Sequence, residues 1–157
     1  MLIQESVIIQ ATAEKVWKVL TNFEKMPEWN HRLKKVWKGA QREGDYPAKM
    51  QLDYQMGNSR LAKFEALVAQ WEPNHRLYFE MKEISVQSSI DRPAKIIEKF
   101  ELIEHEGKTK VLHEVEVRQS NIPWYVRWLI GLINRFGRPV GKGPLDQLKI
   151  LVEQVHF

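Results

Sequence analysis

The fold is decided near the start of the chain, where residues 7–23 read VIIQATAEKVWKVLTNF. The β-branched residues at its beginning, together with those before them, predict a strand from Leu2 to Gln10. The period then changes to that of an amphipathic helix, with an apolar stripe at Val16, Trp17, Leu20 and Phe23. Thr12 is a suitable N-cap for this helix, and Asn22 is a suitable end. The chain is therefore expected to open with a strand that leads directly into a helix.

A second short helix is expected next, followed by strands. Proline fits best in the first turn of a helix, so Pro27-Glu28-Trp29-Asn30 can begin one. From Leu33 onward, turn residues recur at short intervals, at Gly39, Gly44-Asp45, Gly57-Asn58, Pro73-Asn74-His75, Asp91-Arg92-Pro93 and Glu106-Gly107-Lys108. Six strands fit between these breaks, which together with the first strand predicts a seven-stranded antiparallel sheet.

The predicted strands alternate between apolar and polar residues. The clearest alternation runs from Tyr46 to Met56. Because successive side chains point to opposite faces of a strand, this pattern indicates one buried face and one wet face. The last two strands, Lys95 to Ile103 and Thr109 to Arg118, form a hairpin whose register places His113 and Glu98 on the buried face.

The end of the chain is predicted to be helical. Pro123 suits a helix start, the pattern continues to Phe136, and a second segment runs from Pro144 to Val155 after a kink or break at Pro139. This long helix and the first helix can cover the apolar face of a one-sided sheet. The predicted fold class is therefore α+β, with residues 1–157 forming one domain. A curved seven-stranded antiparallel sheet would surround a long C-terminal helix, and two short helices would follow the first strand.

Composition excludes several classes of protein. Hydrophobic residues make up 43% and charged residues 28% of the chain, which is typical of a globular protein. The lack of cysteine excludes disulfides and thiolate zinc sites and favours a cytoplasmic protein. No secretory signal and no apolar run of about 20 residues is found. The net charge of +4 arises from basic residues spread among acidic ones, so no nucleic-acid partner is expected.

Several stretches resemble a known superfamily. The segment from Val7 to Phe23, followed by Met26-Pro27-Glu28-Trp29-Asn30, resembles the opening of the START-like, or SRPBCC, superfamily, which includes polyketide cyclase and dehydratase relatives and birch-pollen-allergen-like proteins. Phe100-Glu101-Leu102 and residues 107–111 resemble its closing hairpin, and residues 145–153 its end. The resemblance covers essentially the whole chain. It implies a helix-grip fold with a cavity that the family uses for lipids, sterols, aromatic polyketides and other apolar molecules.

The first hypothesis for function is a binding module without a cofactor. The candidate lining residues are soft or aromatic side chains on inward strand faces and in the terminal helix, namely Met50, Tyr54, Met56, Phe79, Met81, Phe100, His113, Trp128 and Leu132. Each one taken alone could equally be a core residue, because inward-facing apolar residues mostly pack together. The expected partner is a small hydrophobic molecule, bound by a monomer or a homodimer.

The alternative hypothesis is an enzyme of the cyclase or dehydratase type. In that case His113, with Glu98 or Tyr54, would move protons. A buried imidazole also needs a hydrogen-bond partner in an ordinary core, so a purely structural role is the competing interpretation. The sequence contains no Gly-x-Ser-x-Gly, phosphate-loop, Rossmann or His-Glu-x-x-His signature. No two histidines have a metal-ligand spacing on one element, so no metal is predicted.

Two tryptophan-bearing segments complete the set of candidates. Trp29 is either an anchor that packs its short helix onto the sheet or a residue at the mouth of the cavity. Residues 123–136 are apolar around most of a helical circumference, which exceeds what one sheet can cover. Four explanations compete for this excess. The segment is a helix buried on several sides, a gate over the cavity entrance, a dimer contact, or a shallow membrane attachment through Trp124, Tyr125 and Trp128. The last alternative would make lipid handling at a membrane surface a third hypothesis.

Overall fold

The computed structural model describes residues 2–39, 42–44, 46–56, 60–84, 95–118 and 143–154. The elements follow one another in the order β1 (Leu2–Ile9), α1 (Ala13–Leu20), the 3-10 turn η1 (Phe23–Lys25), α2 (Met26–Trp29), β2 (Leu33–Lys38), β3 (Arg42–Glu43), β4 (Tyr46–Pro47), β5 (Lys49–Met56), β6 (Arg60–Glu72), β7 (Arg76–Glu83), β8 (Lys95–His105), β9 (Lys108–Arg118) and α4 (Pro144–Gln154). The predicted order of strand, short helices, strands and terminal helix is confirmed.

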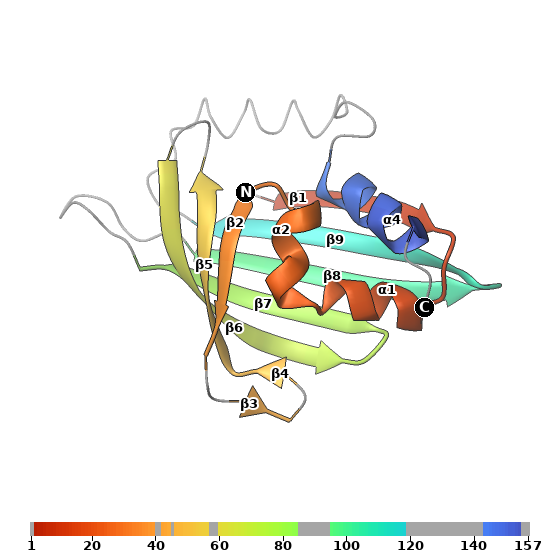
Figure 1. The fold of residues 1–157 in the computed structure, drawn as a ribbon, viewed down its shortest axis with the longest axis horizontal. Coiled ribbons are helices and arrows are strands. Elements are labelled where there is room, and N and C mark those ends of the chain that lie inside the picture. The colour runs from red at the N-terminus through yellow and green to blue at the C-terminus, as the bar shows by residue number, and fades with distance from the viewer. Residues whose placement is uncertain are drawn as a thin grey trace.

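Within the described residues, seven strands form one antiparallel sheet in the order β1-β9-β8-β7-β6-β5-β2. The strands β1 and β2 are neighbours along the chain but lie at opposite edges of this sheet. The chain between them must therefore cross the sheet, and it does so through α1 and α2. Figure 1 shows α1, α2 and α4 together over one face. This arrangement confirms the predicted α+β, helix-grip fold.

Irregular pairing accompanies the curvature of the sheet. The 13-residue strand β6 changes register against β7 between Val68 and Gln70. A second irregularity lies between Leu33 and Lys35 of β2. An extra residue in one strand bends it and increases its twist. Figure 1 shows β6 bending through the sheet, so that β5 and β2 cross the direction of β8 and β9. The face that carries the helices is therefore concave.

The alternation read from the sequence matches the observed burial. Leu77, Phe79 and Met81 of β7 are buried, whereas of the residues between them Glu80 is exposed and Tyr78 is half-buried. The same pattern in the other central strands joins the helices in one hydrophobic core. The inward face of each strand is thus set by its local period, as expected from the pleat.

Helices α1 and α4 are attached to the sheet by hydrogen bonds. Thr12 caps α1 as predicted, with its side chain accepting from the Lys15 amide at 3.3 Å, and the helix ends at Leu20, two residues before the predicted Asn22. The α4 side chains of Lys149 and Glu153 bond to the backbone at the end of β1, with Lys149 Nζ donating to the Ile8 carbonyl at 2.6 Å. At the start of α1, the Ala13 amide donates to the Glu104 carboxylate of β8 at 3.3 Å. The bonds of α4 to β1 and of α1 to β8 hold both helices over the concave face.

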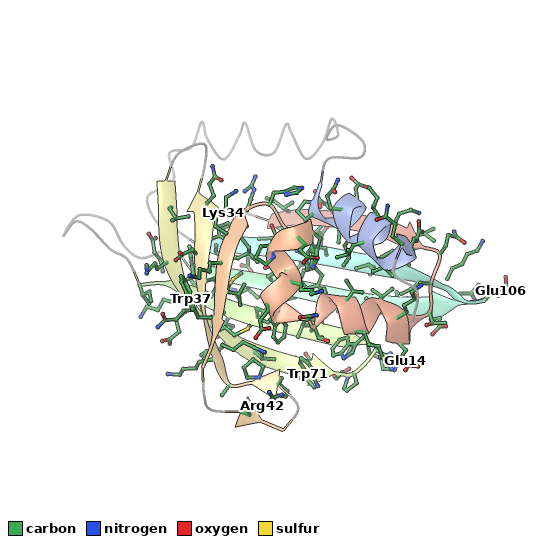
Figure 2. All side chains as sticks on the ribbon, in the orientation of Figure 1. Glu14, Lys34, Trp37, Arg42, Trp71 and Glu106 are labelled. Carbon is green, nitrogen blue, oxygen red and sulfur yellow. The ribbon has the colours of Figure 1, made fainter. Side chains whose placement is uncertain are left out.

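One predicted strand is divided in the structure. The segment expected from Tyr46 to Met56 starts as β4, which pairs with β3 in a separate two-stranded hairpin, and continues as β5 from Lys49. Pro47 has no N–H to donate to a sheet ladder, which favours an interruption at this point. The hairpin packs against Trp71, whose ring stacks on Tyr46 at a centroid distance of 4.8 Å. Figure 2 shows Trp71 between the hairpin and α1. The helix predicted over residues 123–136 lies outside the described residues.

Candidate functional site

A buried polar pair lies on the concave face. His113 of β9 and Glu98 of β8 point inward, and each side chain is 7% exposed. His113 Nε2 lies 2.7 Å from Glu98 Oε1. A carboxylate only accepts hydrogen bonds, so with Glu98 as a carboxylate the hydrogen of this bond is carried by His113 Nε2. The sequence-based prediction that these two residues are inward neighbours is confirmed.

Aromatic rings extend this pair toward α2. Phe100 lies opposite His113 in the β8–β9 register, and the two rings stack with centroids 4.3 Å apart and planes 7° from parallel. The edge of Trp29 contacts Phe100 at a centroid distance of 6.0 Å. Trp29 is fully buried, and its Nε1 has no hydrogen-bond partner among the described residues. The interpretation of Trp29 as an anchor of its helix on the sheet is confirmed, and the anchor carries an unused donor.

The other predicted lining residues spread along the same face. Met50, Phe79 and Met81 are buried, and Tyr54 is half-buried with its ring at the edge of Phe64. Met50 and Met81 lie on either side of Ala66 in the β5–β6–β7 register. The side chain of Met56, and all of Trp128 and Leu132, lie outside the described part of the chain.

The structure separates Tyr54 from the polar pair. Tyr54 is on β5 and His113 is on β9, with β6, β7 and β8 between them. Neighbouring strands are about 4.8 Å apart. The two residues therefore lie on distant strands of the sheet, so Glu98 is the predicted proton-transfer partner that His113 contacts.

Sequence reasoning missed part of the concave face. Ala62, Phe64 and Ala66 of β6 are fully buried there, so a large ring stands between two methyl groups. Glu83 of β7 is also buried, at 4% exposure, and lies opposite Phe64. The sequence could have predicted the burial of Glu83, because Glu83 is two residues after Met81 and side chains two residues apart in a strand point to the same face.

The opposite face carries a polar groove. It has a volume of about 390 Å³ and is lined by Gln4, Glu5, Ser6, Lys99, Glu101, Leu112, His113 and Glu114. Gln4 donates to Glu114 at 2.9 Å, and Lys99 lies 3.3 Å from the same carboxylate. The Gln4 hydrogen bond and the Lys99 charge hold the pKa of Glu114 below its usual value. These ionic contacts make the groove unlike the predicted apolar cavity, and of the predicted lining residues only His113 borders it.

Among the described residues, no three histidine, aspartate or glutamate side chains gather closely enough to hold a metal ion. In the ranges that the structure covers, no helix has both the length and the apolar character needed to cross a membrane.

The fold resembles solved structures along nearly its whole length. A START superfamily protein from Mycobacterium smegmatis is 20% identical, with a TM-score of 0.65 and coverage of 98% of this chain and 97% of that chain. A conserved protein from Geobacillus kaustophilus is 12% identical, with a TM-score of 0.66 and coverage of 100% and 98%. Ara h 8.0201 is 10% identical, with a TM-score of 0.62 and coverage of 99% of each chain. At these identities the likeness shows the fold alone.

The family assignment comes from the sequence. A comparison with curated protein sequences finds no match. The family model described as "Polyketide cyclase / dehydrase and lipid transport" matches residues 2–118. That match contains the strand-to-helix opening and the β8–β9 hairpin with the polar pair. The chain therefore belongs to the polyketide cyclase/dehydrase and lipid transport family, within the START-like superfamily.

Proposed function

We propose that this protein binds a small hydrophobic molecule between the concave face of the sheet and the helices over it. The observation that supports this function is the make-up of that face. Buried Phe79 and Phe100 lie next to the His113–Glu98 pair, and buried Met81 and Met50 extend the apolar surface along β7 and β5. Sites for small ligands are mostly apolar, with a few placed polar groups that orient the molecule. The concave face has this composition.

The side chains suit an apolar ligand whose shape varies. Methionine is unbranched and polarisable, so Met50 and Met81 can adapt to different molecules without a polar penalty. Affinity would come from burial of apolar area, at about 25 cal/mol per Å² before the cost of ordering the ligand. The family description, which includes lipid transport, supports a ligand of this class.

A second function is favoured by one specific contact. The 2.7 Å hydrogen bond between His113 Nε2 and Glu98 Oε1 holds the imidazole in one orientation. A base held in this way could remove a proton next to a carbonyl through Nδ1, as cyclisation or dehydration of a polyketide-like chain requires. Catalysis would then depend on His113, whereas a simple carrier would need it only for orientation.

Lipid handling at a membrane surface stays a hypothesis. It depends on Trp124, Tyr125 and Trp128, which lie outside the described residues. The His113–Glu98 pair and the apolar residues beside it all belong to the described ranges, so they can be varied separately from that segment.

Native mass spectrometry of protein purified from its own host tests the proposed function. We expect a mass above that of a denatured control, from a co-purifying apolar molecule. The bound compound is then released from the loaded protein and incubated with fresh folded apoprotein. Whether the compound is converted in this incubation separates carriage from catalysis. Release of the molecule unchanged supports a carrier, and chemical conversion that Ala replacement of His113 abolishes supports the enzyme. A mass equal to that of the bare chain, with no uptake of added apolar probes, would contradict both.

A further inference from the structure

The indole N–H of Trp29 is a buried donor without a partner in the part of the chain that the structure describes. The side chain is 0% exposed, and Nε1 has no acceptor among the described residues. Buried polar groups in native proteins nearly always have a hydrogen-bond partner, and an exception calls for an explanation. The indole nitrogen is a donor only, so the missing partner must be an acceptor.

The polar groups next to Trp29 are satisfied within the chain. The Asn30 amide donates to the Met26 carbonyl at 2.8 Å, and the Asn30 carbonyl accepts from the Leu33 amide at 3.0 Å. Asn30 Oδ1 accepts from the Arg32 amide at 3.3 Å. The backbone groups and the side-chain oxygen of Asn30 therefore all have partners. The unused donor is specific to the Trp29 side chain and does not arise from a loosely formed loop.

The location of Trp29 links it to the candidate ligand site. Its ring contacts Phe100, Phe100 stacks on His113, and His113 bonds Glu98. All four side chains are buried on the concave side of the sheet. The unused N–H thus belongs to the same cluster as the polar pair and lies among the apolar walls on which the proposed function rests.

We infer that Trp29 Nε1 donates a hydrogen bond to the ligand, and that the ligand is an apolar molecule bearing a neutral acceptor oxygen such as a ketone or hydroxyl. This inference rests on the proposed ligand-binding function. A pure hydrocarbon would leave the indole unpaired. A carboxylate would be buried on the face that already holds Glu98 and Glu83, where a further negative charge is costly. A site built to hydrogen-bond a ligand discriminates against the analogue that lacks the group.

Fluorenone and fluorene form a matched pair of probes, because they have the same ring system and differ in a carbonyl oxygen. In proton–nitrogen correlation NMR spectra of the wild-type protein, fluorenone should move the Trp29 indole resonance downfield, as expected on formation of a hydrogen bond. Fluorene should produce a smaller shift of the same resonance, and that shift should not be downfield. The resonance is assigned by its loss in Trp29→Phe. This measurement uses the unaltered protein, so it does not depend on the stability of any variant.

Equilibrium dialysis then measures the preference itself. The wild-type protein should bind fluorenone about fivefold more tightly than fluorene, the effect of one neutral hydrogen bond. Trp29→Phe retains an aromatic ring but removes the N–H, and should bind the two probes equally. Trp17→Phe is the matched control, because Trp17 is also a buried tryptophan, on α1, and contacts Trp71 instead of Phe100. It should keep the preference.

The outcomes distinguish the inference from the function beneath it. Equal binding of both probes by the wild type, or a preference that survives Trp29→Phe, would overturn the inference and leave ligand binding intact. Binding of neither probe by the wild type would overturn the proposed function and the inference with it. A preference lost in Trp29→Phe and kept in Trp17→Phe supports both.

Discussion

His113 Nε2 lies 2.7 Å from Glu98 Oε1, and both side chains are buried between the sheet and the helices. Among the described residues, neither side chain has a second hydrogen bond or ion pair that could replace its partner. A buried carboxylate that loses its partner is costly, because water does not replace the lost interaction. The two side chains therefore act as a unit, and changing one of them changes the environment of the other.

Breaking this pair should be more harmful than removing it. His113→Leu leaves the Glu98 carboxylate buried without its partner and should lower the free energy of unfolding by about 3 kcal/mol. The double variant His113→Leu/Glu98→Leu carries no buried charge and should recover part of that loss. Urea unfolding followed by circular dichroism measures both. Equal destabilisation in the single and double variants would show that the lost packing of the imidazole, and not the charge, dominates.

Filling the concave face at Ala66 should block ligand binding. If the Ala66 methyl group borders ligand space between Met50 and Met81, Ala66→Leu will fit in the ligand-free protein but occlude the probe. We expect at least a tenfold weaker affinity for fluorenone by equilibrium dialysis, with little change in thermal stability. Ala69→Leu, at an exposed position of the same strand, is the control and should bind normally. A loss of about 1–3 kcal/mol in unfolding free energy for Ala66→Leu would instead indicate a closely packed core at this position.

The Glu114 carboxyl should titrate below its usual range. The hydrogen bond from Gln4 is the main cause of its lowered pKa, and Lys99 adds to it. A depressed folded-state pKa adds stability above the unfolded-state pKa, and this stability is lost as the pH falls through the folded-state pKa. Gln4→Ala should raise the Glu114 pKa toward its ordinary value, as followed by carboxyl-carbon NMR. An unchanged titration in Gln4→Ala would leave Lys99 as the dominant influence.

Tyr78 should resist deprotonation in alkali. Burial, followed by the hydrogen bond that its hydroxyl donates to Glu101, raises the pKa of Tyr78 to about 12. A raised pKa means that the folded state favours the neutral phenol. This contribution to stability is complete below the unfolded-state pKa of about 10 and is lost as the pH rises through about 12.

The absorbance of the phenolate, taken as the difference between wild type and Tyr78→Phe, reports this titration. Glu101→Gln removes the charge but not the burial, so the midpoint should fall only part of the way toward the ordinary tyrosine value. A midpoint that falls completely would show that Glu101 alone causes the shift.

The inward faces of the strands could be predicted from the sequence, because successive side chains of a strand alternate between its buried and exposed faces. His113 and Glu98 were identified in this way, since both belong to one hairpin whose short turn sets the register. Met50, Phe79, Met81 and Phe100 were placed on buried faces for the same reason. Glu83 obeys the same rule but was overlooked as a charged residue at the end of its strand. The division of the strand at Pro47 needed the hairpin partner, which local alternation does not reveal.

The sequence by itself determined the elements, their order and the side of each strand that is buried, because these depend on residue periods, caps and turns over short distances. Only the tertiary structure decided which distant residues meet. Pairing of β1 with β9 sends the chain across the sheet and brings Trp29 onto Phe100. It also leaves the Trp29 N–H without an acceptor in the described ranges of the chain, and it keeps Tyr54 several strands away from His113. These relationships arise from sheet order and curvature, which pack residues remote in sequence and have no local signal.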